Sequence, residues 1–147
     1  MKILIDADGC PVVDIAVDIA VKNNIECIII CDTSHFFEKK GAKTITVSKG
    51  ADSTDFFLVN IISSEDIAVT QDYGLAAMCL AKKATVLNQD GMIYDNSNID
   101  SLLMSRHISK KIRNAGGKLK GPSKRKPEQN LFFARKLEEI LKDKGCN

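Results

Sequence analysis

Short apolar runs alternate with longer amphipathic stretches over the first 90 residues, and this alternation constrains the fold more than any other feature of the chain. The runs predicted as strands are 3–5, 26–31, 44–47, 66–70 and 84–87, and the helices predicted between them are 11–22, 52–62 and 73–83. Strands separated by helices require crossover connections and form an open parallel sheet with helices on both faces. The sequence therefore predicts a doubly wound α/β fold with a mainly parallel five-stranded sheet.

Beyond Gly91 the strand–helix alternation gives way to helical patterns separated by a basic segment. A helix is expected to begin at residue 97 or 99 and to end at 114. Residues 115–127 are rich in glycine and lysine, and a final helix is expected over 128–144. We expect this basic helical segment to pack on the α/β body.

Two of the predicted helices carry apolar side chains at helical spacing, which indicates the face that each should bury. The expected core residues of the 52–62 helix are Phe56, Val59 and Ile62, and those of the last helix are Leu131, Phe132 or Phe133, Leu137, Ile140 and Leu141.

The 147 residues are enough for one hydrophobic core and too few for two comfortable ones. We therefore expect a single domain over 1–147, with an acidic body at 1–95 and a basic tail at 96–147. Counted over residues 1–100, eight Lys and Arg face fifteen Asp and Glu, a net charge of −7, whereas 101–147 carry thirteen against four, a net charge of +9. Such asymmetry is typical of chains that bind a polyanion through the basic part, although a solvated helical surface has the same composition.

Neither the first residues of the chain nor its cysteine pattern indicates export. The run from Met1 reaches an acid after only three apolar residues, so it lacks the core of a signal peptide. No uncharged stretch approaches the roughly 20 residues that span a bilayer. The five cysteines form no paired clusters, which disfavours a zinc site and favours buried thiols. We expect a cytoplasmic protein with no membrane contact.

Acidic residues follow most of the predicted strands. They are Asp6 and Asp8 after the first strand, Asp52 and Asp55 after the third, Asp72 after the fourth and Asp90 after the fifth. Because ligands of open α/β sheets bind outside the carboxyl ends of the strands, these carboxylates are expected to converge. Crowded carboxylates are stable at neutral pH mainly when a cation neutralises them, and Mg²⁺ or Mn²⁺ prefers oxygen ligands. The sequence therefore predicts a divalent metal site.

Helix capping is the alternative role for several of these acids. An aspartate at a helix N-terminus accepts backbone N–H groups and complements the helix dipole, and Asp52, Asp55 and Asp72 all precede or begin predicted helices. Asp8, two residues past its strand, has the same alternative. Which of Asp52 and Asp55 faces the site stays open.

Four sequence blocks carry a resemblance to a known family. The blocks are Asp6-Ala7-Asp8-Gly9-Cys10-Pro11-Val12, Gly50-Ala51-Asp52-Ser53-Thr54-Asp55, Thr70-Gln71-Asp72-Tyr73-Gly74-Leu75-Ala76, and Gly121-Pro122 with Arg125. With them the chain resembles the bacterial YaiI/YqxD family, which is grouped with the PIN-like domains. The resemblance implies a PIN-like fold and an acidic pocket that, in active relatives, holds Mg²⁺ or Mn²⁺ for RNA cleavage.

The resemblance also implies roles for individual acids. Asp6 is similar to the first-strand acid of PIN-like nucleases, and Thr70-Gln71-Asp72 is similar to their T-x-D motif. Asp52 or Asp55 matches the region of their helical acid, and Asp90 matches the last one. The Asp-Ala-Asp-Gly-Cys-Pro turn and the basic tail depart from the typical pattern.

Basic residues of the tail supply candidate contacts to the substrate. They are Lys118, Lys120, Lys124, Arg125 and Lys126, in a segment that also contains glycine. The chain has no Trp, so stacking platforms are scarce and we expect contact with a nucleic-acid backbone rather than sequence recognition.

The leading functional hypothesis is a metal-dependent nuclease acting on RNA, in which Asp6, Asp55 and Asp72 hold the ion and metal-activated water attacks the phosphodiester. A second hypothesis is a haloacid-dehalogenase-like phosphatase, because the opening strand is followed by a D-x-D-G pattern in which Asp6 would be the nucleophile and Asp8 the acid/base. A third is a non-catalytic module that binds RNA or a protein partner.

Overall fold

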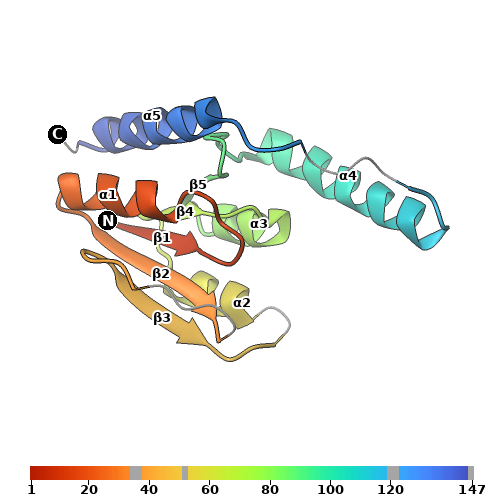
Figure 1. Ribbon diagram of the computed structural model, residues 1–147, viewed down its shortest axis with the longest axis horizontal. Coiled ribbons are helices and arrows are strands. Elements are labelled where there is room, and N and C mark those ends of the chain that lie inside the picture. Colours follow the sequence, from red (N-terminus) through yellow and green to blue (C-terminus); the bar gives the residue numbers. More distant parts are fainter. Residues whose placement is uncertain (34–37, 51–52, 119–122, 146–147) are drawn as a thin grey trace.

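The computed structural model describes residues 1–33, 38–50, 53–118 and 123–145, and its centre is a five-stranded sheet. The strands are β1 (Lys2–Asp6), β2 (Glu26–Asp32), β3 (Lys43–Val47), β4 (Ile67–Val69) and β5 (Thr85–Leu87). Their order in the sheet is β3-β2-β1-β4-β5, and every neighbouring pair is parallel (Figure 1). The predicted doubly wound α/β fold is confirmed, and it is consistent with a PIN-like domain.

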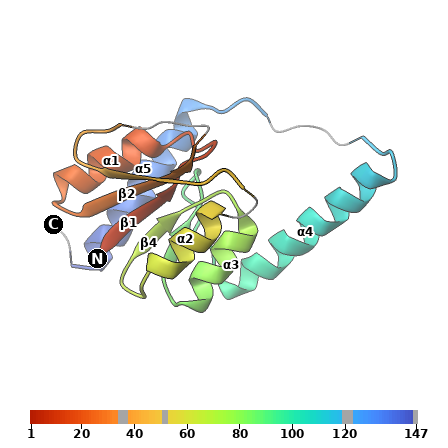
Figure 2. The ribbon, with the colours of Figure 1, turned by 90° about the horizontal axis from the view of Figure 1, so that it is seen from below.

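Helices cover both faces of this sheet. They are α1 (Val13–Lys22), α2 (Ser53–Ile61), α3 (Tyr73–Ala81), α4 (Asn96–Asn114) and α5 (Pro127–Asp143). Figure 2 shows α1 and α5 on one side of the strands and α2 and α3 on the other. The first helix begins at Val13 rather than at the predicted Pro11, because Pro11 still belongs to the turn that follows β1.

Two hydrophobic cores flank the sheet, and the central strand β1 contributes to both. Ile3 and Ile5 pack among residues of α1 and α5, whereas Leu4 between them packs with residues of α2 and α3. This division follows from the alternation of side chains along a strand. Phe133 and Leu137 of α5 are fully buried in the first core. The basic tail therefore ends in a helix that shares a core with the body.

The apolar faces of two helices match those predicted in part, since Ile62, Phe133, Leu137, Ile140 and Leu141 are buried as expected. Phe56 of α2 is 60% exposed, and Leu58 is the residue that is fully buried. In α5, Leu131 and Phe132 are exposed and Phe133 is buried. Both segments contain consecutive apolar residues, so spacing alone fits more than one face. The choice is made by the sheet against which each helix packs.

α4 begins with a strong cap and then leaves the body. Asp95 accepts hydrogen bonds from the backbone N–H groups of Ser97 and Asn98, and the Asn98 side chain accepts one from Asp95 in return. The start of α4 lies beside α3, while its C-terminal half extends outward (Figures 1 and 2). No helix in the described part of the chain is long and apolar enough to cross a membrane.

Asp66 joins the amino ends of two central strands. Its carboxylate is 1% exposed and accepts hydrogen bonds from the backbone N–H of Lys2 at 2.8 Å and of Ser63 at 2.9 Å. The Ser63 hydroxyl donates at 3.0 Å, and the Lys2 ammonium lies at 3.1 Å. Burial alone would raise the pKa of Asp66, but these hydrogen bonds outweigh burial and lower it. This cluster fixes the start of β1 against the start of β4.

The close approach of α5 to the loop after β5 requires glycine at position 91. Gly91 has φ +86°, and a Cβ added there would lie 2.8 Å from the Phe132 carbonyl oxygen. Gly91→Ala should therefore lower the free energy of unfolding by about 3 kcal/mol, from left-handed strain plus overpacking. Gly116→Ala is the matched control, because Gly116 has φ +84° with nothing within 4 Å. Equal losses in urea denaturation would contradict the proposed contact with α5.

Candidate active site

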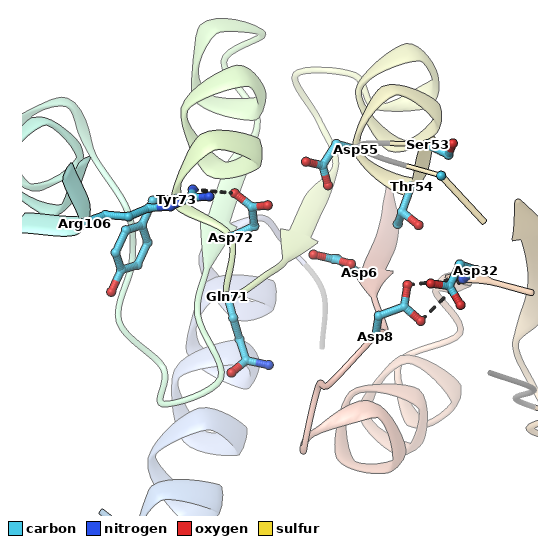
Figure 3. A pocket seen from close by; sticks show the side chains of 11 residues that line it. Asp6, Asp8, Asp32, Ser53, Thr54, Asp55, Gln71, Asp72, Tyr73 and Arg106 are labelled. Atoms are coloured by element: carbon cyan, nitrogen blue, oxygen red, sulfur yellow. Dashed lines mark hydrogen bonds and ion pairs between the residues drawn. The ribbon is translucent and has the colours of Figure 1, made fainter. Parts of the chain in front are cut away.

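An acidic pocket lies at the carboxyl ends of β1 and β2, beside the first turns of α2 and α3. Its volume is about 480 Å³, and it is open to solvent. The residues that line it are Asp6, Asp8, Asp32, Gly50, Ser53, Thr54, Asp55, Gln71, Asp72, Tyr73 and Arg106. Figure 3 shows the carboxylates of Asp6, Asp8, Asp55 and Asp72 around one space. The fold thus brings together four of the six acids predicted from the sequence.

Asp6 ends β1 and is a partly buried carboxylate of this pocket. Its Oδ2 accepts a hydrogen bond from the Thr70 hydroxyl at 2.8 Å. Burial raises the pKa of Asp6 from 3.8 to about 6; the bond from Thr70 lowers it, and the charges of Asp72 and Asp8 raise it further. A carboxylate destabilised in this way gains from any cation that enters the pocket.

Thr70 connects Asp6 to the next acid. The Thr70 hydroxyl accepts a hydrogen bond from the backbone N–H of Asp72 at 3.0 Å while it donates to Asp6. The Thr70 carbonyl accepts a hydrogen bond from the buried Tyr94 hydroxyl at 3.1 Å. Thr70 is itself buried, so it holds Asp6 and the start of α3 in a fixed relation.

Asp72 both caps α3 and faces the pocket. Its Oδ1 accepts hydrogen bonds from the backbone N–H groups of Gly74 at 2.8 Å and Leu75 at 3.2 Å. Within the described part of the chain, no hydrogen bond is formed by Oδ2. The capping role and the site role considered for Asp72 are therefore compatible, since each uses a different oxygen.

Asp8 lies in the turn after β1 and is tied to the end of β2. Its carboxylate accepts a hydrogen bond from the backbone N–H of Asp32, with the shorter distance 3.2 Å to Oδ2. Asp32 was not predicted as a site residue, although it ends β2 and so obeys the same strand-end rule as the other acids. Asp32 could have been predicted by considering the acid at the end of every strand.

Asp55 lies in the first turn of α2 and lines the pocket together with Ser53 and Thr54. Asp52, the other acid predicted for this position, lies outside the described residues. The structure therefore places Asp55 at the site.

Arg106 of α4 is a pocket residue that no sequence signal indicated. Its Nη1 lies 3.5 Å from Oδ1 of Asp72, and both side chains are partly exposed. Arg106 and Asp72 are 34 residues apart and come together only because α4 starts beside α3. Arg106 is the single cation among the described lining residues.

Asp90 lies apart from the acidic pocket. Its Oδ1 forms an ion pair with the Arg125 guanidinium at 2.6 Å and accepts a hydrogen bond from Gln129 at 3.0 Å. The structure thus does not bring Asp90 to the acids with which it was predicted to hold a metal. The physical reason is that the loop after β5 turns toward α5, where Arg125 compensates the charge.

The predicted basic contacts divide into three groups. Lys118 is exposed after the end of α4, and Lys120 lies outside the described residues. Lys124, Arg125 and Lys126 line a second pocket, which also contains Asp90. This second pocket shares Gln71 with the acidic pocket, so the two hollows adjoin.

The donor set of the acidic pocket suits a hard divalent cation, because its charged ligands are all carboxylates. In the described residues, however, no three His, Cys, Asp or Glu side chains are close enough to form a metal site as they stand. Oxygen ligands of the right chemistry are therefore present around one space, and the side chains would have to close on an ion.

Nearly the whole chain is similar to one known protein family. Residues 4–143 match the family model described as "Uncharacterized BCR, YaiI/YqxD family". The chain belongs to the YaiI/YqxD family. Its relatives include UPF0178 proteins of Exiguobacterium sibiricum, 47% identical over 98% of this chain and 99% of the relative, and of Ruminiclostridium cellulolyticum, 49% identical over 97% and 93%.

A third YaiI/YqxD relative is the UPF0178 protein CA_C2825 of Clostridium acetobutylicum, 43% identical over 96% of this chain and 97% of the relative. No solved structure matches the chain. The resemblance seen in the sequence blocks is confirmed at the level of the YaiI/YqxD family.

Proposed function

We propose that this protein is a divalent-metal-dependent nuclease that acts on RNA. The observation that carries the proposal is the convergence of Asp6, Asp8, Asp55 and Asp72 on one open pocket. These acids come from separate parts of the chain, and capping of individual helices does not require them to meet. The raised pKa of Asp6 supports the proposal, because perturbed carboxylates in a hollow are typical of functional sites.

Asp6, Asp55 and Asp72 are the residues that would hold Mg²⁺ or Mn²⁺, with Asp8 as a further oxygen donor. When bound, the cation would neutralise the carboxylates and activate water for attack on a phosphodiester. Thr70 keeps one oxygen of Asp6 fixed, and the N-terminus of α3 does the same for Asp72. The protein therefore supplies two pre-oriented carboxylates, which reduces the reorganisation needed when a substrate binds.

Arg106 supplies a positive group at the edge of the same pocket. A guanidinium recognises phosphate oxygens well, because its donors match their spacing. In the free protein it lies near Asp72, and in a complex it would be within reach of a phosphate held beside the acids. The net charge of +9 over residues 101–147 favours a polyanionic substrate.

The test is cleavage of a labelled single-stranded RNA by the purified protein with Mn²⁺ or Mg²⁺. Asp72→Asn should lower the cleavage rate at least about 100-fold, since it removes one carboxylate while asparagine still caps α3. Asp95→Asn is the matched control, because Asp95 caps α4 through the same pattern of bonds and does not line the pocket. This control should retain full activity.

Cleavage by Asp72→Asn within tenfold of the unmodified protein would overturn the proposal. RNA binding without cleavage under either metal would favour the non-catalytic module instead. Turnover of a simple phosphomonoester, with loss on Asp6→Asn, would favour the phosphatase hypothesis.

A further inference from the structure

The second pocket, next to the acidic one, has a volume of about 580 Å³ and the opposite charge. Its charged lining consists of Asp90, Lys124, Arg125 and Lys126, a formal net charge of +2. Gln71 lies between the two pockets, and its side-chain amide donates to the Gly9 carbonyl at 2.8 Å. A polyanion that reaches the acids can therefore place a neighbouring group among these cations.

Arg125 organises this pocket rather than offering its own charge to a ligand. Its guanidinium donates to Asp90 Oδ1 and to the Gln89 carbonyl, each at 2.6 Å, and to Asn130 Oδ1 at 2.8 Å. These bonds attach the segment before α5 to the loop after β5. The RNA contact predicted for Arg125 from the sequence is thus better described as positioning, and the charge of Asp90 is cancelled locally.

Lys124 and Lys126 remain as the cations available to a ligand. They flank Arg125 in the sequence, and both are exposed. Neither ammonium group forms an ion pair with any residue that the structure describes. Lys126 also precedes the first turn of the 17-residue helix α5, whose N-terminus adds partial positive charge. This combination is suited to a phosphate group.

Gln89 adds a second feature, a polar atom that a bare phosphate would leave unpaired. Gln89 lines this pocket, and its Oε1 is, over the described residues, the one buried side-chain polar atom without a hydrogen-bond partner. Such an atom costs free energy unless a ligand or water pairs with it. A hydroxyl group satisfies the amide in either orientation, because it both donates and accepts.

We propose that the second pocket is a ribonucleotide subsite: Lys124 and Lys126 bind the phosphate of a nucleotide flanking the one at the acids, and Gln89 binds its 2′-hydroxyl. The inference rests on the proposed nuclease function and adds the basis on which RNA is distinguished from DNA. The 2′-hydroxyl is the group that differs between the two, and it lies close to the backbone phosphate.

The experiment measures equilibrium binding of rA10 and dA10 in EDTA, so that cleavage plays no part. The unmodified protein should bind rA10 about fivefold more tightly than dA10, as expected for one added hydrogen bond. Gln89→Met should remove this preference without lowering thermal stability, because the lost atom has no protein partner among the described residues.

Lys124→Gln/Lys126→Gln should weaken binding of both oligonucleotides by about tenfold and reduce the slope of log affinity against log salt by about 1. Lys142→Gln/Lys144→Gln is the matched control: it removes the same charge from exposed residues at the other end of α5. The control should weaken binding of the two oligonucleotides less than Lys124→Gln/Lys126→Gln does.

The subsite is overturned if Gln89→Met leaves the preference for rA10 unchanged, if the unmodified protein shows no preference, or if both lysine pairs weaken binding equally. Cleavage of RNA by the unmodified protein in Mn²⁺ would still support the nuclease in those cases. If instead no metal supports cleavage and the binding pattern holds, the nuclease fails and the ribonucleotide subsite stands.

Discussion

Asp6→Asn should raise the free energy of unfolding at pH 7.5 by about 1–2 kcal/mol while it lowers RNA cleavage at least about 1000-fold. Both effects follow from the removal of one charge: the folded protein no longer bears the cost of an ionised carboxylate in a half-buried position, and the proposed cation loses a ligand. Asparagine keeps an oxygen that can accept the bond from Thr70 and has no charge to desolvate. The full shift of the Asp6 pKa to about 6 would correspond to a larger free-energy gain than this. The expected gain is smaller because the site is partly exposed and solvent screens the charge.

The pH dependence of the stability contributed by Asp6 has a defined sign. The folded-state pKa of Asp6, about 6, is above its ordinary value of 3.8, so the folded protein holds this proton more tightly than the unfolded chain. The stability linked to Asp6 is therefore fully present below pH 3.8 and is lost as pH rises through 6. The difference in free energy of unfolding between Asp6→Asn and the unmodified protein should therefore be small at pH 4, grow between pH 4 and 6, and then level off.

Urea denaturation of both proteins across this pH range, in EDTA, measures the effect. Asp18→Asn, an exposed residue of α1, is the control and should show no such trend. Mn²⁺ should stabilise the unmodified protein and leave Asp6→Asn unchanged. A variant that is less stable than the unmodified protein at pH 7.5 would contradict the account of Asp6.

Asp66→Asn should lower the free energy of unfolding by about 3 kcal/mol, because it changes a buried hydrogen-bond acceptor while the shape of the side chain is almost unchanged. The new amide keeps one oxygen and places its NH₂ group against the donors of either Lys2 or Ser63, in a position that is 1% exposed. The loss should be seen as a lower urea midpoint at neutral pH.

The sign of the pH dependence at Asp66 is opposite to that at Asp6. Its folded-state pKa is lowered, so its contribution is present above the ordinary value of 3.8 and is lost as pH falls through the folded value. The difference in free energy of unfolding between Asp66→Asn and the unmodified protein should therefore become smaller in acid. Glu65→Gln, the exposed neighbour, should have almost no effect, and a comparable loss there would contradict the role of the Asp66 cluster.

The fold was predictable from the sequence because each layer has its own pattern. Apolar runs such as Ile3-Leu4-Ile5 can be buried on both faces only in a central parallel strand, and the helices between such runs determine the direction of the chain. The core face of α2 was not predictable, since Phe56, Phe57 and Leu58 are consecutive and local spacing favours none of them.

The candidate site was predictable where it depends on strand ends and not where it depends on tertiary packing. Asp6 and Asp72 follow strands and lie at the pocket as expected. Arg106 reaches the pocket from a helix whose direction no local pattern fixes, and Asp90 leaves it because Arg125 offers a partner. Long-range ion pairs of this kind leave no periodic signal in the sequence.

The hydrogen bonds of Asp6 and Asp72 limit how each carboxylate can coordinate. Within the described residues, Oδ2 of Asp6 is engaged by Thr70 and Oδ1 of Asp72 by the amides of α3, which leaves one oxygen of each. If the pocket takes a cation as proposed above, each would act as a monodentate ligand. Ca²⁺ often takes carboxylates through both oxygens at once, whereas Mg²⁺ accepts single oxygens and retains water in an octahedral shell. We therefore expect the bonds of Asp6 to the Thr70 hydroxyl and of Asp72 to the amides of α3 to favour the smaller ion at the proposed metal site.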